Sequence, residues 1–231
     1  MLCLGHEDLL SPPSHRVTLV SPAKRKPIRR IITAAMSVHA LAKSKDHTFS
    51  KVSVPAVKLL AGLGVDGDCH AGKLVQHQAS TPAGGSSKSG SAASGSGSSR
   101  PINLRQVHLI PIEILDGVSI QPGQIGENIT TAGLDLFSLG RGDRLHFYSP
   151  AAKHASDAHA VVVVTGLREP GPKLERFRAG LKECFTFRDD DGKVLGWTAG
   201  IMGTVETGGT VQVGMNIVVE QAKKYKALKC V

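Results

Sequence analysis

Residues 62–72 place several chemically active side chains close together. They read Gly-Leu-Gly-Val-Asp-Gly-Asp-Cys-His-Ala-Gly. Glycine permits positive φ and close approach of the backbone to a ligand, so neighbouring N–H groups can cradle an anion. Asp68 and His70 can orient one another or contact a polar ligand. The alternative is a tight loop in which Asp68 caps local N–H groups and His70 merely packs.

Two later segments carry polar groups in apolar or glycine-rich surroundings. Arg105 interrupts the apolar stretch 103–113. Its guanidinium suits phosphate or carboxylate, although an internal ion pair with Glu113 explains it equally well. Glu127 and Asn128 stand at a sharp turn after a glycine. They can bind the edge of a heterocycle, or satisfy the backbone of their own turn.

Arg168 and Lys173 follow an apolar strand and flank the rigid turn Pro170-Gly171-Pro172. Cations at a strand end near glycine-rich loops suit an anionic cofactor, and an ordinary solvated loop is the alternative. Asp143 lies in Gly-Asp-Arg before a strand, where we expect it to serve a turn.

Short strands and turns must position these groups. The chain has 26 glycines, 12 prolines and 41% hydrophobic residues, which favours short strands over long helices. We therefore predict a mainly β fold whose strands are too close together for βαβ crossovers. The expected strands are Val107–Ile114 (continuing into a short helix), Leu145–Tyr148, Ala160–Thr165, Thr204–Val205 and Val211–Val219. Arg176–Cys184 is the main helical candidate, weakened by Gly180.

The net charge of +9 raises the question of nucleic acid, but its location argues against that partner. Residues 61–221 carry 14 basic against 16 acidic residues, so the excess of positive charge lies in the two ends. A duplex-binding face needs basic residues clustered on folded structure. We expect no nucleic-acid partner and, without an apolar run of about 18 residues, no membrane partner.

The N-terminal segment and one internal segment differ in composition from the rest of the chain. Residues 1–35 are basic and contain proline, so we expect a disordered extension, or a start at Met36 rather than Met1. Their composition is also similar to that of a transit peptide, which leaves mitochondrial targeting as the alternative to a cytoplasmic location. Residues 80–99 are rich in Ser and Gly and predict a flexible insertion within one domain, 36–231. The four cysteines show no CxxC spacing, which argues against a secreted disulfide scaffold.

In order along the chain, these motifs resemble the MOSC domain family, the type found at the C-terminus of molybdenum-cofactor sulfurases. Residues 64–72 match the family pattern G-x-x-G-D-x-H-A-G, 105–110 match R-Q-V-x-L-I, and 126–133 match G-E-N-I-T-T-x-G. The resemblance extends over about 50–221. It implies a closed or partly open β-barrel, similar to the pyruvate-kinase β domain, with a few short helices.

The resemblance also implies a pocket for the molybdenum cofactor (molybdopterin). The residues that match the family's positions and should face this pocket are Asp68, His70, Arg105, Glu127, Asn128, Arg168 and Lys173. The departure is Gly171, which stands where the family places a cysteine that ligates the metal or carries a persulfide. Cys69 is a candidate substitute for that sulfur, although we favour a buried inert thiol. We therefore assign no catalytic residue.

The function implied by the resemblance is a molybdoenzyme that reduces N-hydroxylated small molecules or handles sulfur for its cofactor. The sequence shows no flavin, haem or Fe–S motif, so a separate electron-donor protein is expected. The alternative is a non-catalytic cofactor-binding or carrier module that lost activity with its cysteine. A sulfurase would need a PLP-dependent domain for which 231 residues leave no room, so we expect no PLP.

Overall fold

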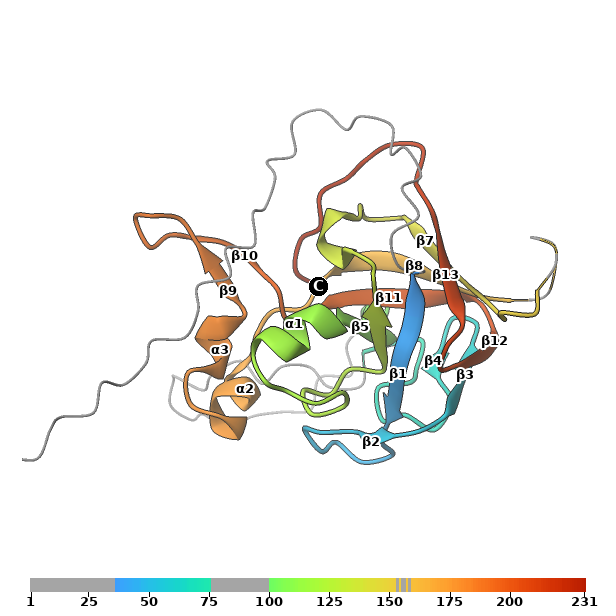
Figure 1. Cartoon of the computed structure of the whole chain (residues 1–231), viewed down its shortest axis with the longest axis horizontal. Helices are drawn as coiled ribbons and strands as arrows, with labels where there is room; N and C mark the ends of the chain where they lie inside the picture. Colours follow the sequence, from blue (N-terminus) through green and yellow to red (C-terminus); the bar gives the residue numbers. More distant parts are fainter. Residues whose placement is uncertain (1–35, 76–99, 153, 155–156, 158) are drawn as a thin grey trace, which may run out of the picture. The chain divides into compact units, whose positions relative to one another are not determined.

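A seven-stranded, mostly antiparallel β-barrel forms the centre of the described chain (Figure 1). The computed structural model describes residues 36–75, 100–152, 154, 157 and 159–231. Around the barrel the strands are β13 (Asn216–Glu220), β7 (Arg144–Tyr148), β8 (Ala160–Leu167), β11 (Ile201–Thr207), β5 (Val107–Pro111), β6 (Ile129–Ala132) and β1 (Ser37–Lys43). The predicted mainly β class, with a closed or partly open barrel and a few short helices, is confirmed, and the barrel is closed.

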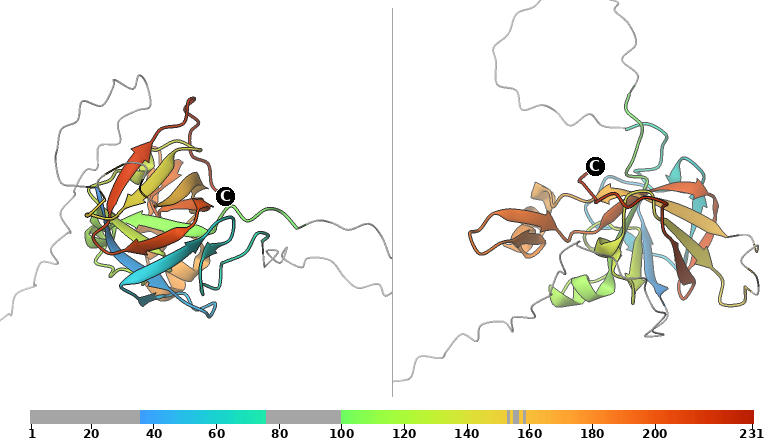
Figure 2. Two further views of the ribbon diagram at one scale, coloured as in Figure 1. Left: turned by 90° about the vertical axis from the view of Figure 1, so that its right-hand side faces the viewer. Right: turned by 90° about the horizontal axis from the view of Figure 1, so that it is seen from above.

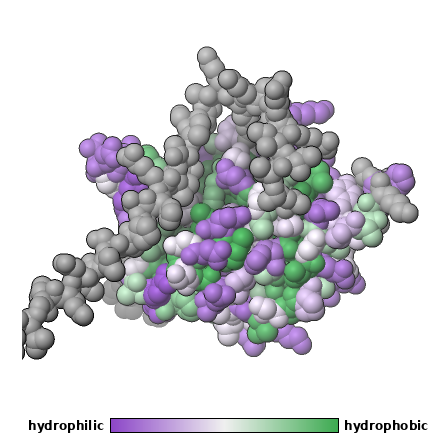
Figure 3. All heavy atoms as spheres, viewed as in Figure 1, coloured by the Kyte–Doolittle hydropathy of each residue, from purple (hydrophilic) through white to green (hydrophobic). Residues whose placement is uncertain are grey.

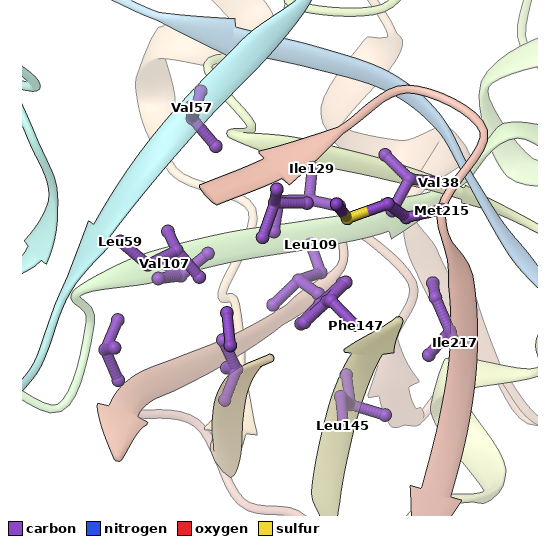
Figure 4. Packing of buried hydrophobic residues seen from close by; sticks show 14 of the residues in the cluster. Val38, Val57, Leu59, Val107, Leu109, Ile129, Leu145, Phe147, Met215 and Ile217 are labelled. Carbon is purple, nitrogen blue, oxygen red and sulfur yellow. The ribbon is translucent and has the colours of Figure 1, made fainter. Parts of the chain in front are cut away.

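Pairing of β1 with β13 closes the barrel. Ser37 aligns with Asn216, and the Val38 N–H donates to the Met215 carbonyl at 2.9 Å. Closure leaves these strands no unpaired edge. The strands alternate in exposure, as in β7, where Leu145 and Phe147 are buried between partly exposed neighbours. These inward side chains fill the barrel (Figure 4).

Two smaller sheets complete the strand inventory of the described residues. The first has the order β12 (Gly209–Gln212), β3 (Ala56–Leu60), β4 (Gly64–Val65), and the second pairs β10 (Val194–Trp197) with β9 (Thr186–Arg188). A short β2 (Val52–Ser53) extends the main sheet beyond β1, and a 3-10 turn, η1 (Leu136–Ser138), precedes β7. Val57 and Leu59 of β3 join the barrel core.

Three short helices lie to one side of the barrel: α1 (Ile112–Gly117), α2 (Pro172–Phe177) and α3 (Leu181–Cys184). Together with β9 and β10, α2 and α3 stand apart from the barrel strands in Figure 1 and in the right-hand view of Figure 2. A second apolar cluster joins α2 and α3 to α1 and the following loop. It contains Ile110, Leu115, Ile120, Ile125, Leu174, Leu181, Phe185 and Ala199. This cluster fixes the loop after β8, where Arg168 and Gly171 lie.

The prediction that βαβ crossovers are absent was wrong at one place. Strands β5 and β6 pair in parallel, with Leu109 opposite Ile129, and α1 lies between them in the chain. The connection from Ile112 to Asn128 is long enough for one short helix and a turn. A single short crossover therefore fits within a barrel that is otherwise antiparallel.

Two predicted elements are interrupted by glycine. The expected strand Val211–Val219 divides into β12 and β13, because Gly214 turns the chain with φ +84°. The expected helix Arg176–Cys184 divides into the end of α2 and α3, because the chain is extended at Arg178 and Gly180 adopts φ +77°. Positive φ is readily accessible to glycine and ends a regular strand or helix.

The remaining element predictions agree with the structure. Val107–Ile114 does begin as a strand and continue into a helix, and the other three expected strands lie within β7, β8 and β11. On the face shown in Figure 3, hydrophilic and hydrophobic residues are mixed in small groups. Within the part of the chain that the structure describes, no helix is both long and apolar enough to cross a membrane. The predicted extension 1–35 and insertion 80–99 lie outside the described residues.

Candidate functional site

Most of the site residues predicted from the sequence line one pocket, which has a volume of about 610 Å³. Its walls come from the loop between β1 and β2, the loop after β4, the segment before β5, the turn before β6, and the loop between β8 and α2. Of the residues predicted from sequence, its lining includes Cys69, His70, Arg105, Asn128, Arg168, Gly171 and Lys173. A pocket of this size accommodates a cofactor or small substrate.

Arg168 is the group whose surroundings most clearly call for a ligand. Its backbone N–H donates to the Gly200 carbonyl at 2.9 Å, which fixes the residue at the end of β8. Its Nη1 is buried and has no hydrogen-bond partner among the described residues. Burial and the neighbouring charge of Arg105 lower the pKa of Arg168 to about 10, while Glu127 opposes this shift. Arg168 thus stays charged at neutral pH with an unsatisfied donor at the pocket.

Besides the ion-paired Lys51, two further cations line the same pocket. Arg105 is exposed, and its backbone N–H donates to Asn103 Oδ1 at 2.9 Å. The Asn103 amide in turn donates to the carbonyls of His70 and Gly72, each at 3.0 Å, so it ties the segment before β5 to the loop after β4. Lys173 is exposed on α2. The three cations give the pocket a positive wall suited to phosphate or carboxylate.

Asp68 lies behind the pocket wall and forms a buried ion pair with Lys51. Lys51 Nζ and Asp68 Oδ2 are 2.8 Å apart, with side chains 2% and 1% exposed. Burial would raise the pKa of Asp68, but hydrogen bonds from His70 and the adjacent Lys51 charge outweigh it and hold the pKa well below its usual range. Burial lowers the pKa of Lys51, and Asp68 opposes this. Asp68 therefore anchors the loop after β4 as a carboxylate.

Glu127 and Asn128 also act largely within the protein. Glu127 is fully buried, and its Oε1 accepts a short hydrogen bond from the Gly123 N–H, while Oε2 has no partner among the described residues. Burial raises the pKa of Glu127. The Asn128 amide donates to Asp68 Oδ2 at 3.0 Å, and its Oδ1 accepts from the His108 backbone at 3.2 Å. These bonds join the turn before β6 to the loop after β4 and to β5.

His108 lines the pocket from β5 as a neutral imidazole. Its Nε2 lies 2.8 Å from the Ala199 carbonyl, to which it donates. Burial first, and the charge of Arg168 second, lower the pKa of His108 well below its usual value. The ring therefore supplies a fixed donor to the protein and adds no charge to the pocket.

Cys69 and His70 lie together on the loop after β4. Cys69 Sγ is 3.1 Å from His70 Nδ1, and the Cys69 N–H donates to the Ser44 carbonyl at 2.8 Å. Burial, reinforced by the Asp68 charge, raises the pKa of the Cys69 thiol. A raised pKa keeps the isolated thiol protonated and limits its nucleophilicity.

Gly171 lies at the N-terminus of α2 in an extended conformation, with φ −84°. A Cβ built on it meets nothing within 4 Å. Neither the backbone angle nor crowding requires glycine here, so a cysteine side chain would fit. The pocket therefore has open space, and no side chain, at position 171.

The structure thus divides the predicted site residues into two groups. His70, Arg105, Asn128, Arg168 and Lys173 line the pocket. Asp68 and Glu127 are absent from the lining. Asp68 pairs with Lys51 and His70, whereas Glu127 accepts from the Gly123 N–H through Oε1 and has no partner among the described residues for Oε2. Cofactor binding by either group stays a prediction.

Sequence reasoning missed four contributors from the loop between β1 and β2: His47, Thr48, Phe49 and the buried Lys51. These residues stand in Lys-Asp-His-Thr-Phe-Ser-Lys, which has the composition of an ordinary surface loop. The one available signal was that this segment precedes the first glycine-rich motif, with β2 and β3 between them.

The chain resembles the crystal structure of the YUAD protein from Bacillus subtilis, with TM-score 0.58 and 20% identity over 82% of this chain and 98% of that one. YiiM from Geobacillus stearothermophilus gives TM-score 0.49 and 16% identity over 80% and 75% of the two chains. No curated protein matches the chain. Residues 103–218 match the MOSC domain model, and the chain therefore belongs to the MOSC domain family.

Proposed function

We propose that the pocket binds the molybdenum cofactor through its anionic groups. The observation that carries this proposal is the buried, unpartnered Nη1 of Arg168, with Arg105 and Lys173 on the same pocket. A buried guanidinium donor without a partner costs free energy, and a bound phosphate oxygen would satisfy it. Membership of the MOSC family supports molybdopterin as the ligand class.

The residues present fit such a ligand. Arg105, Arg168 and Lys173 would hold the phosphate, and the rigid loops tied by Asn128 and Asp68 would keep these cations in place. When bound, the cofactor would supply two-electron oxygen-atom chemistry at its metal. Neutral His108 adds no charge to the pocket and leaves its anion preference intact.

The first test is retention of molybdenum by the full chain expressed in a cofactor-competent host. We expect the purified protein to carry molybdenum and Arg168→Met to lose it. Arg141→Met, at an exposed arginine outside the pocket lining, is the matched control and should retain the metal. Wild-type protein without molybdenum, or equal retention by Arg168→Met, would refute the proposal.

Two activities are compatible with this ligand. In the first, the protein reduces N-hydroxylated small molecules with electrons from a separate donor protein. In the second, it carries the cofactor or its sulfur without turnover. The empty position at Gly171 favours the second, because glycine supplies neither a metal ligand nor a persulfide.

Reduction of an amidoxime or a hydroxylamino-purine separates the two activities. The cofactor-loaded wild type and Gly171→Cys should be assayed with an artificial electron donor. Turnover by the wild type would exclude the carrier. Inactivity of both proteins, with molybdenum bound to both, would exclude the reductase.

A further inference from the structure

His47, Cys69 and His70 form a compact group of metal-binding side chains on the pocket. One ligand atom from each residue lies within 4.8 Å of the others. His47 comes from the loop between β1 and β2, while Cys69 and His70 come from the loop after β4. All three residues line the pocket, so the group faces the space that a ligand would occupy.

The spacing of these atoms is close to that of a tetrahedral zinc site. Zinc–sulfur and zinc–nitrogen bonds of about 2.3 and 2.0 Å place neighbouring ligand atoms roughly 3.5 Å apart. Cys69 Sγ and His70 Nδ1 are already 3.1 Å apart. The His47 and His70 rings stand edge to face with centroids 5.7 Å apart. His47 is exposed on the loop between β1 and β2.

The supporting residues hold the Cys69–His70 pair in place. Asp68 Oδ1 accepts a hydrogen bond from the His70 backbone at 3.0 Å and lies 3.3 Å from its Nδ1. These contacts hold the backbone of His70 and keep its ring beside Cys69. Asp68 is itself fixed by Lys51 at 2.8 Å, and the Cys69 backbone is fixed by Ser44. The loop that carries Cys69 and His70 is thus held in place before any ion binds.

We propose that His47, Cys69 and His70 bind a divalent ion of the zinc class, with one coordination position open to the pocket. One thiolate and two imidazoles are ligands that zinc prefers, and three protein ligands are typical of sites that keep a position for water or substrate. That open position would face the same pocket as Arg168 and Lys173. An anionic ligand could then contact the metal and the cations together.

This proposal does not depend on the molybdenum cofactor. The sulfur and nitrogen ligands belong to the chain, and the ion can be added to protein that has never contained molybdopterin. The main competitor among the described residues is His146, which contacts His159 at 2.9 Å and Glu220 at 3.0 Å on the barrel strands. It lacks a thiol, so a sulfur-dependent signal distinguishes the two groups.

The test uses the full chain, expressed in a host without the cofactor, stripped with a chelator and titrated with Co²⁺. We expect a thiolate-to-cobalt charge-transfer absorption that Zn²⁺ abolishes by displacement. Cys69→Ser should lack this absorption. His47→Ala should weaken Co²⁺ binding about tenfold or more. Loss of a group that only orients a metal ligand already lowers metal affinity about 10–100-fold.

Two matched controls use residues outside the group. Cys184→Ser removes an exposed free cysteine, and His159→Ala disrupts the other histidine group; both should bind Co²⁺ as the wild type does. If circular dichroism shows that Cys69→Ser does not fold, the Co²⁺ titration of His47→Ala, a substitution at an exposed residue, tests the proposal instead. Absorption that persists in folded Cys69→Ser, disappears in Cys184→Ser, or titrates identically in His47→Ala would overturn the proposal.

Discussion

Replacing Arg168 with methionine should stabilise the ligand-free protein while it weakens anion binding. Methionine keeps a long side chain that can pack at the end of β8, but it removes the buried Nη1 that has no partner. A residue retained for structure would behave in the opposite way. The sign of the stability change therefore separates a ligand site from a structural arginine.

The magnitude follows from three contributions. An unsatisfied buried donor costs about 1–3 kcal/mol, which the substitution recovers. Removing Arg168 also relieves its repulsion with Arg105, but it loses the attraction to buried Glu127. Burial already raises the pKa of Glu127, so this carboxyl can take up a proton and limit that loss. We expect a net increase of about 1 kcal/mol in the free energy of unfolding.

Urea denaturation of the apo protein measures this change, with Arg105→Met as the control for an exposed pocket arginine, expected within about 0.5 kcal/mol of wild type. Inorganic phosphate at ten times its dissociation constant should stabilise the wild type by about 1.4 kcal/mol. Arg168→Met should show a much smaller response. A loss of more than about 1 kcal/mol in apo Arg168→Met, repeated in a variant that also carries Glu127→Gln, would refute the reasoning.

Other perturbations follow from the same geometry. Lys51→Met leaves Asp68 buried without its cation and should cost about 3 kcal/mol in urea denaturation, whereas Arg144→Met at the exposed pair with Glu206 should cost under about 1 kcal/mol. Because the folded pKa of Asp68 is depressed, its stabilising contribution is present above the ordinary value of 3.8 and is lost as pH falls below it. Asp68→Asn should therefore flatten the acid limb of a stability–pH curve, and an unchanged limb would contradict the assignment. Gly171→Cys should leave the melting temperature unchanged, since the position has φ −84° and open space, and a fall of several degrees would contradict that description.

The fold was predictable from sequence wherever a strand carries its own alternation or apolar run. The strands β7 and β8 and the passage from β5 into α1 follow directly from such runs. Failures occurred where tertiary pairing decides the outcome. Nothing local to 107–132 indicates that β5 and β6 pair in parallel, because that depends on where α1 packs. The glycines that divide 211–219 and 176–184 were visible, but their positive φ was not.

The site was predictable in part for a similar reason. Glycine-rich motifs and cations mark which loops surround the pocket, and five of the predicted residues do line it. The sequence cannot show which polar groups form hydrogen bonds or ion pairs within the protein. The carboxylates of Asp68 and Glu127 have the right chemistry to bind a ligand. In the structure, however, Asp68 pairs with Lys51 and His70, and Glu127 accepts a hydrogen bond from the Gly123 N–H.

Position 171 carries no cysteine, so the thiol that lines the pocket is that of Cys69, on the loop after β4. Gly171 meets no neighbour that forbids a side chain, so the missing thiol reflects the chemistry of this chain rather than a constraint of its fold. Cys69 lines the same pocket, but it lies 3.1 Å from an imidazole and beside an anchored carboxylate. That environment suits a thiolate held by a metal with two histidines better than a free nucleophile or persulfide carrier. If the Co²⁺ titration succeeds, the pocket joins a borderline-soft metal to a cationic wall, and the search for a substrate should turn to anions that can contact both.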